Sequence, residues 1–368
     1  MALSKHKLGE LIIAVDERNT TGIKDFYGLN INKEFIPTVA NTSGLDESKY
    51  KVVRRGRFAF SGMQTGRDKC IRISMSQREM PMIVSPAYIT FEVGMPDLVL
   101  PEYLFMWLRS PERDRLGWFS SDGSIRANLD WTVFCDFEIN LPPLDIQRKY
   151  VAIYESMLRN QHAYEQGLDD LKLTIDALFD RCKHEGLLVR LDDLLTETDA
   201  RNVDMLPLAP MGISLNHRFQ ISRAEIKDKS KYKLVQPGQM AVNLIHVGRD
   251  AAYPIALNQS DDPVLVSPDY SVLKAADADT AQYLMGWFSR SEVGRHGWFI
   301  CDVDIRGRLN LDKFLSLRIP VPDVTLIRSI ADLCHGYQER VSINERLKRQ
   351  LKDICPVLIK GSMEEASR

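Results

Sequence analysis

The alternation of hydrophobic and polar residues changes its period along the chain, and the same change occurs twice. YKVVRRGRFAFSGM from Tyr50 and PMIVSPAYITFEV from Pro81 are rich in β-branched and aromatic residues, with Gly and Pro between them, which predicts strands and turns. LPEYLFMWLRSPERDRLGW from Leu100 predicts a short helix, and Phe134–Leu141 predicts a strand that ends at prolines. Each half of the chain is therefore expected to begin with a mixed globular part.

After these strands the apolar residues recur at gaps of three and four. The first seam contains Tyr150, Tyr154, Met157, Gln161, Tyr164, Leu168, Leu171, Ile175, Leu178 and Cys182. The second seam contains Ile330, Leu333, Tyr337, Val341, Asn344, Leu347, Leu351, Ile354 and Leu358. Seams of this length predict coiled-coil helices of ~40 residues, each ~60 Å long. We expect the two helices to pair antiparallel, with Asn344 fixing the register; the alternative is that each helix packs on its own domain.

The chain is a tandem duplication. Tyr103–Arg148 aligns with Tyr283–Arg328 without a gap at an offset of about 180 residues, and GWFSSDGSIR from Gly117 matches GWFICDVDIR from Gly297. SKYK, GRD and VSP-x-Y also occur in both copies, so the repeat is a whole domain with its connector. We predict an α+β fold in which two similar mixed domains are joined by the two helices. The first globular domain is predicted at 1–143 and the first long helix at 144–186. The second globular domain follows at 187–322, and the second helix with a tail at 323–368.

Composition places few limits on function. Hydrophobic residues make up 44% and charged residues 27% of the chain, as in ordinary globular proteins. No apolar run approaches 18 residues and the N-terminus does not resemble a signal peptide, so no membrane association is expected. The six Cys form no C-x-x-C pair, which argues against a zinc site or disulfide framework. Reduced thiols in a cytoplasmic protein are the simplest interpretation.

Charge is unevenly distributed. The net charge of −2 weighs mildly against nucleic-acid binding, but Ser48–Arg78 contains nine Lys and Arg residues and a single acid, Asp68. Its counterpart, Arg218–Asp250, is less basic and still net positive. The sequence leaves two interpretations of these stretches open: an anion-binding face and a solvated basic face.

No catalytic signature survives inspection. The chain has no phosphate-binding loop, no G-x-S-x-G elbow and no H-E-x-x-H motif. Asp122 and Asp302, with Arg126 and Arg306, recur in the repeated loop, but no second carboxylate or His accompanies them in both copies. We therefore predict that the loop binds a phosphate or closes on itself through an Arg–Asp pair.

Two tryptophans belong to the same repeated loop. We expect Trp118 and Trp298 to be core anchors rather than platforms on which bases stack.

The order of these elements resembles the specificity subunit of type I restriction–modification enzymes. In GSIRANLDWTVFCDFEINLPPLDIQRKYVAI the residues that fit the family pattern are Gly123, Ser124, Arg126, Ile139, Leu141, Pro142, Pro143, Leu144 and Gln147. The second copy keeps Ile305, Arg306, Leu309, Ile319, Pro320 and Pro322. It loses the Gly, the second Pro and the Gln, so the match is weaker there. The resemblance covers nearly the whole chain.

The resemblance implies a DNA-binding subunit without catalytic activity or cofactor. Each globular part would be a target recognition domain that reads one half of a bipartite sequence in double-stranded DNA. The helices would set the spacing between half-sites. Two methyltransferase subunits would dock on the chain, with a translocase–nuclease subunit as a further candidate partner. A coiled-coil interaction scaffold and a stand-alone DNA-modifying enzyme are the alternatives.

The candidate DNA-binding residues fall into classes. Lysines of the shared S-K-Y-K are expected to contact phosphates, since the DNA backbone is the same everywhere: Lys49, Lys51, Lys231 and Lys233. The basic stretch adds Arg54, Arg55 and Arg57. Residues that differ between copies are better candidates for reading bases: Gln64 and His246. Arg67 and Arg249 could contact phosphates or read bases. Arg126 and Arg306 are expected to face the DNA backbone.

Overall fold

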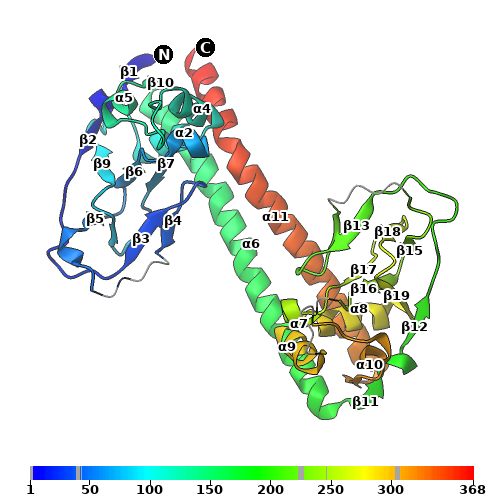
Figure 1. Ribbon diagram of the computed structural model, residues 1–368. Helices are drawn as coiled ribbons and strands as arrows, with labels where there is room; N and C mark the ends of the chain where they lie inside the picture. The colour runs from blue at the N-terminus through cyan, green and yellow to red at the C-terminus, as the bar shows by residue number, and fades with distance from the viewer. Residues whose placement is uncertain (1–2, 39–41, 43, 223–227, 246, 303–306) are drawn as a thin grey trace. The chain divides into compact units, whose positions relative to one another are not determined.

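The computed structural model describes residues 3–38, 42, 44–222, 228–245, 247–302 and 307–368 (Figure 1). The chain divides into two compact units. Unit 1 combines Met1–Ala163 with Asn344–Arg368, and unit 2 is Tyr164–Ile343. Each unit contains two four-stranded sheets, a two-stranded ribbon and a pair of helical segments. The predicted α+β class, with duplicated mixed domains and two long helices, is confirmed.

Strand β6 of unit 1 is buried on both faces: Phe58 and Phe60 belong to the main core, and Ala59 packs with residues of the mixed sheet. An antiparallel sheet has the order β2-β9-β6-β7, with bounds Ile12–Ala14, Ile89–Val93, Phe58–Ser61 and Arg72–Met75. A mixed sheet has the order β4-β3-β8-β5, with bounds Phe35–Pro37, Phe26–Leu29, Met82–Val84 and Lys51–Val53. In the mixed sheet β3 and β8 are parallel. An antiparallel ribbon joins β1 and β10, Ser4–Lys7 and Glu138–Leu141.

Among the described residues of unit 1, five short helices connect the strands. They are α1 to α5, with bounds Leu8–Leu11, Thr65–Asp68, Pro101–Leu108, Pro111–Phe119 and Trp131–Cys135. A 3₁₀ turn, η1, Glu47–Lys49, lies between β4 and β5. Their starts follow capping rules. Ser110 accepts a 3.3 Å hydrogen bond from the Glu112 amide at the start of α4, and Asp130 accepts one of 2.7 Å from the Thr132 amide at the start of α5.

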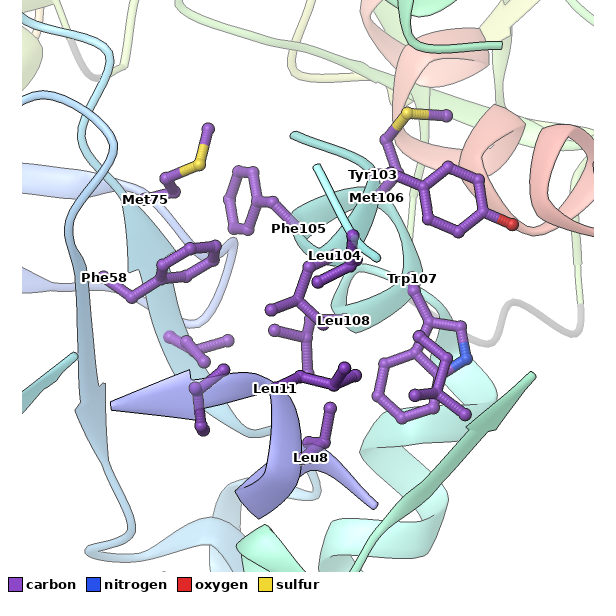
Figure 2. Packing of buried hydrophobic residues seen from close by; sticks show 14 of the residues in the cluster. Leu8, Leu11, Phe58, Met75, Tyr103, Leu104, Phe105, Met106, Trp107 and Leu108 are labelled. Carbon is purple, nitrogen blue, oxygen red and sulfur yellow. The ribbon is translucent and has the colours of Figure 1, made fainter. Parts of the chain in front are cut away.

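Helix α3 forms the centre of the core of unit 1 (Figure 2). Its last six residues, from Tyr103 to Leu108, are all buried, and Phe58 stacks on Phe91 with ring centroids 4.7 Å apart. Tyr154 of α6, Leu144–Glu185, and Cys355 of α11, Val324–Ala366, belong to the same hydrophobic cluster. The globular part and its helix pair therefore share one core, and neither long helix packs on only one partner.

Unit 2 repeats this arrangement. Its antiparallel sheet β12-β19-β16-β17 has bounds Leu195–Thr198, Ser271–Ala275, Gln239–Val242 and Ile255–Leu257. Its mixed sheet β14-β13-β18-β15 has bounds Phe219–Ile221, Pro210–Ile213, Val264–Val266 and Lys233–Val235. The ribbon pairs β11 and β20, Leu187–Arg190 and Arg318–Val321. The short helices η2 and α7 to α10 have bounds Leu191–Asp193, Val247–Asp250, Ala278–Phe288, Ser291–Ile300 and Leu311–Leu315.

The two long helices are α6, Leu144–Glu185, and α11, Val324–Ala366. In unit 1 Lys149 pairs with Glu365 at 2.8 Å, and the later residue Gln161 pairs with the earlier Asn344. Partners run in opposite directions along the two helices, so the predicted antiparallel pairing is confirmed there. In unit 2 the Arg340 guanidinium lies over the Tyr164 ring, 5.7 Å from its centroid.

Phe179 is fully buried and lies outside the predicted seam of α6. Its ring packs against Tyr283 and Trp287 of α8. The stripe that α6 buries is therefore wider than a coiled-coil seam, because the globular part covers it as well as the other helix.

Candidate nucleic-acid interface

The basic stretch Ser48–Arg78 is largely neutralised by acids from other segments of unit 1. Each partner lies outside the stretch in sequence, and the pairs are Lys51–Asp16, Arg54–Glu17, Arg57–Glu17, Arg57–Glu92, Arg55–Glu79 and Arg78–Asp25. The hydrogen bond from Arg54 holds the pKa of Glu17 below its ordinary value. A count of charge along the sequence therefore overstates the positive potential of this region.

The shared S-K-Y-K motif belongs to a clamp that holds the mixed sheet in both units. In unit 1 Arg18 donates a 2.6 Å hydrogen bond to the Lys49 carbonyl, and Lys51 lies 3.4 Å from Asp16. An isolated β-bridge also joins Arg18 to Lys51.

Unit 2 contains the same clamp. Arg201 donates a 2.8 Å hydrogen bond to the Lys231 carbonyl, Lys233 lies 3.5 Å from Asp199, and Arg201 bridges Lys233. The repeated D-x-R-N that supplies these partners begins at Asp16 and Asp199. The presence of D-x-R-N in both copies could have predicted the clamp from sequence, but the sequence analysis assigned no role to this motif.

Burial separates the predicted phosphate contacts into two groups. Only 12% of the Lys51 side chain and 9% of the Lys233 side chain are exposed, and Arg57 is buried between Glu17 and Glu92. The geometry of these three favours a structural role. The exposed members of the predicted set are Lys49, Arg54, Arg55, Arg67, Arg126 and Lys231. Four of them form ion pairs with described residues: Lys49 with Asp46, Arg54 with Glu17, Arg55 with Glu79 and Arg67 with Asp68.

The repeated GRD and GWF motifs meet at one place, which we call the GRD corner: residues 62–69 with residues 117–129 in unit 1. The Gly66 amide donates to the Ala127 carbonyl at 2.9 Å, and the Leu129 amide donates to the Gly62 carbonyl at 2.8 Å. Gln64, in a left-handed conformation with φ 64°, accepts a 2.7 Å hydrogen bond from Arg67. Gln64 and Arg67, predicted to contact DNA, thus lie together.

Close approach explains why both motifs contain glycine. A Cβ on Gly66 would lie 2.6 Å from the Ala127 Cβ, and one on Gly117 would lie 2.5 Å from the Ile71 side chain. In unit 2 a Cβ on Gly248 would lie 2.7 Å from the Gly307 Cα, and one on Gly297 would lie 2.6 Å from the Tyr253 ring. The glycines therefore let α2 or α7 pack directly against the repeated loop.

Asp122 closes the repeated loop without Arg126. Its Oδ1 accepts hydrogen bonds from the Ser124 hydroxyl at 2.6 Å and the Asn128 amide at 2.9 Å. These hydrogen bonds, led by that of Ser124, hold the pKa of Asp122 below its ordinary value. Arg126 is exposed and has no hydrogen-bond or ion-pair partner among the described residues. The Arg–Asp alternative for this loop is wrong in unit 1.

Trp118 and Trp298 are not core anchors, which corrects the sequence interpretation. They are 46% and 61% exposed, and Lys69 lies over the Trp118 ring with its Nζ 4.5 Å from the centroid. The reason is the glycine before each Trp. Gly117 and Gly297 take the position of closest approach to the core, so the next residue in each helix turns toward the surface.

Three predicted residues of unit 2 cannot be compared. His246 and Arg306 lie outside the described residues, and the Arg249 side chain does too. The backbone of the corner is nonetheless the same, because the Gly248 amide donates to the Gly307 carbonyl at 2.9 Å and the Leu309 amide donates to the Leu244 carbonyl at 2.8 Å. The DNA-binding roles assigned from sequence stay predictions in both units.

Within the part of the chain that the structure describes, no cluster of three or more His, Cys, Asp or Glu is arranged to hold a metal ion. None of the described helices has an apolar stretch that could span a bilayer.

Sequence comparison gives no relative: no protein-family model and no curated protein matches the chain. Solved structures do match. The S subunit of a type I restriction–modification system from M. genitalium aligns with a TM-score of 0.62 at 10% identity, covering 98% of this chain and 96% of that one.

Two further structures align over similar lengths. The HsdS subunit from Thermoanaerobacter tengcongensis has a TM-score of 0.41 at 16% identity, covering 98% of this chain and 96% of that one. A chain from a study of complex assembly and conformational transition in the type I system has a TM-score of 0.47 at 16% identity, covering 100% and 97%. The fold assignment rests on the M. genitalium subunit, and it confirms the resemblance at the level of fold.

Proposed function

We propose that this chain is the specificity subunit of a type I restriction–modification complex, in which units 1 and 2 each read one half of a bipartite sequence in double-stranded DNA. The observation that carries the proposal is the likeness of the whole duplicated fold to an S subunit over 98% of the chain. A duplicated fold suits this task, since two similar but unequal domains offer two unequal reading surfaces.

The DNA-facing surface would include the GRD corner and the exposed lysines of S-K-Y-K. Arg67 and Arg126 lie together at the corner of unit 1, exposed to solvent, and Lys49 and Lys231 occupy matching exposed positions in the two clamps. Phosphate contacts from these side chains would position the duplex. The left-handed Gln64, held by Arg67, is the candidate for reading a base in unit 1.

Catalysis would come from partner subunits. In this proposal two methyltransferase subunits bind the chain and modify the DNA, with a translocase–nuclease subunit as a further partner, and the chain works in the cytoplasm. The chain itself supplies no catalytic residue and no cofactor. Its own chemistry is confined to hydrogen bonds, charge and stacking at the DNA surface.

Reconstitution with a cognate methyltransferase subunit tests the proposal. The full chain plus that subunit and a methyl donor is expected to methylate bipartite sites, which sequencing of the methylated DNA would locate. The chain alone should give none, and binding should weaken sharply with salt. Methylation by the chain alone would identify a stand-alone enzyme. Absence of salt-dependent DNA binding by the complex would favour an interaction scaffold and overturn the proposal.

A further inference from the structure

Each unit exposes a pair of adjacent aromatic side chains at the same place in its fold. Phe119 follows Trp118 at the end of α4 and is 88% exposed. Phe299 follows Trp298 near the end of α9 and is 81% exposed. An isolated exposed aromatic residue needs no explanation. Two adjacent ones, retained in both copies while much of the sequence around them differs, indicate a surface with a shared task.

Unpaired positive charge lies beside the aromatic pair of unit 1, over Trp118 and in the loop that follows Phe119. Lys69 lies over the Trp118 ring, and neither Lys69 nor Arg126 has an acidic partner among the described residues. The nearby carboxylates are already engaged: Asp68 pairs with Arg67 and Arg72, and Asp122 closes its own loop.

The aromatic pair of unit 2 has the same kind of neighbour. Arg295 is exposed one helical turn before Trp298 on α9 and has no ion pair among the described residues. Aromatic faces beside unpaired cations fit a polyanion that carries flat rings. A protein surface is the competing occupant, because protein interfaces are enriched in Trp, Phe and Arg, and the measurements below separate the two.

We propose, on the basis of the function proposed above, that Phe119 and Phe299 act as aromatic wedges that pack against unstacked bases of the bound DNA, one wedge in each unit. Trp118 with Lys69 forms the floor beside the first wedge. Cations such as Arg126 hold the phosphates on either side of the step, and the aromatic ring replaces the stacking that the base loses.

A pair of DNA probes tests this role without knowledge of the target sequence. One is a fully paired duplex of about 40 base pairs, and the other has the same sequence with three unpaired bases at its centre. Unpaired bases remove the cost of unstacking, so the full chain should bind the second probe about tenfold more tightly. Phe119→Ala with Phe299→Ala should abolish that preference and leave the dependence of binding on salt concentration unchanged.

Two exposed apolar residues outside the corners supply the matched control. Met80→Ala with Val203→Ala removes similarly exposed side chains, one from each unit, and should keep the preference. Intrinsic tryptophan fluorescence gives a second measurement. Bound DNA should quench the fluorescence of the wild-type chain more strongly than that of the variant with Trp118→Phe and Trp298→Phe. Urea unfolding midpoints should not change in any of these variants, since all the side chains are exposed.

The outcomes separate the wedge from the proposed function. Binding of both probes with equal affinity, or a preference that survives in the Phe119→Ala, Phe299→Ala variant, overturns the wedge and leaves DNA recognition standing. Failure of both the chain and its complex with the methyltransferase subunit to bind either probe at low salt overturns the proposed function itself. Wild-type DNA binding by the double variant, together with loss of methyltransferase-subunit binding, would show that a protein covers the aromatic pair and would also overturn the wedge.

Discussion

Gln161 donates a 3.0 Å hydrogen bond from its Nε2 to Oδ1 of Asn344 across the buried seam between α6 and α11 in unit 1. Both side chains are buried among apolar seam residues. A shift of one helix along the other would leave both amides without this partner. The pair therefore favours one register, as a buried polar residue does in a coiled coil.

Removal of one member of this pair should cost more than removal of both. Asn344→Ala leaves the Gln161 amide buried without that partner and is expected to destabilise the protein by about 1–3 kcal/mol. Gln161→Leu with Asn344→Leu should lie close to wild type in stability, measured by urea unfolding, with His162→Ala as the exposed control. A double variant no more stable than Asn344→Ala would contradict this role.

A buried ion pair anchors the β3–β4 hairpin of unit 1 to α4. The Nζ of Lys33 lies 2.7 Å from Oδ1 of Asp114 and donates to the Leu108 carbonyl at 2.5 Å, while Asp114 also accepts from the Ile71 amide. Asp114→Ala is expected to cost about 3–5 kcal/mol because the ammonium of Lys33 remains buried and unpaired. Arg115→Ala breaks an exposed pair with Glu112 on the same helix and should cost about 1 kcal/mol or less. Equal losses in the two unfolding experiments would count against the anchor.

Substitution of Arg126 should affect DNA binding, whereas substitution of the clamp residue Lys51 should affect stability. Arg126→Ala is expected to weaken DNA binding and lower the slope of log K against log salt by about 1, without a change in unfolding. Lys51→Ala removes a 2.8 Å hydrogen bond to the Tyr88 carbonyl and the contact with Asp16, so it should lower stability by about 1–3 kcal/mol. A Lys51→Ala variant of unchanged stability but reduced salt slope would restore Lys51 as a phosphate contact.

His217 should make unit 2 sensitive to mild acid. Burial lowers its pKa, which outweighs the opposing effect of its contact with the Ile255 carbonyl. The unfolded chain then takes up a proton below about pH 6.5 while the folded protein still holds His217 neutral, so stability should fall as the pH drops below that value.

Comparison with His217→Asn isolates this residue. Asn tolerates the left-handed conformation of position 217, φ 58°, and does not titrate. Thermal unfolding between pH 5 and 8 should show a smaller loss at low pH in the variant. Identical pH profiles for the two proteins would assign the acid sensitivity to other groups.

The periodic parts of the fold could be predicted from sequence because their signals are local or repeated. The seam of α6 and the duplicated GWF loops each lie within a short stretch that can be compared with its copy. Phe179 escaped prediction because a heptad describes one partner helix, whereas α6 also packs against α8. The width of the helix face that is buried depends on all the elements packed against it, and the period of the apolar residues does not identify those elements.

The candidate site was predicted less well, for two physical reasons. Lys51 and Arg57 looked like free cations because their partners, Asp16 and Glu92, lie about 35 residues away in sequence. Trp118 looked like a core residue because large aromatic side chains usually are. Its exposure depends on the neighbouring Gly117, which occupies the point of closest contact with Ile71.

Unit 1 is made of two separate stretches of chain, and unit 2 is inserted between them. Leu351, Cys355, Leu358 and Ile359 belong to the core of unit 1 but are synthesised after unit 2. Unit 2 inserts 180 residues, Tyr164–Ile343, between the two stretches, so the first stretch waits on the order of 10–40 s for its missing helix at ordinary rates of translation. The domain encoded second is thus the first that can complete its core during synthesis. Until then the apolar surface of unit 1 that α11 covers in the folded protein stays exposed in the nascent chain.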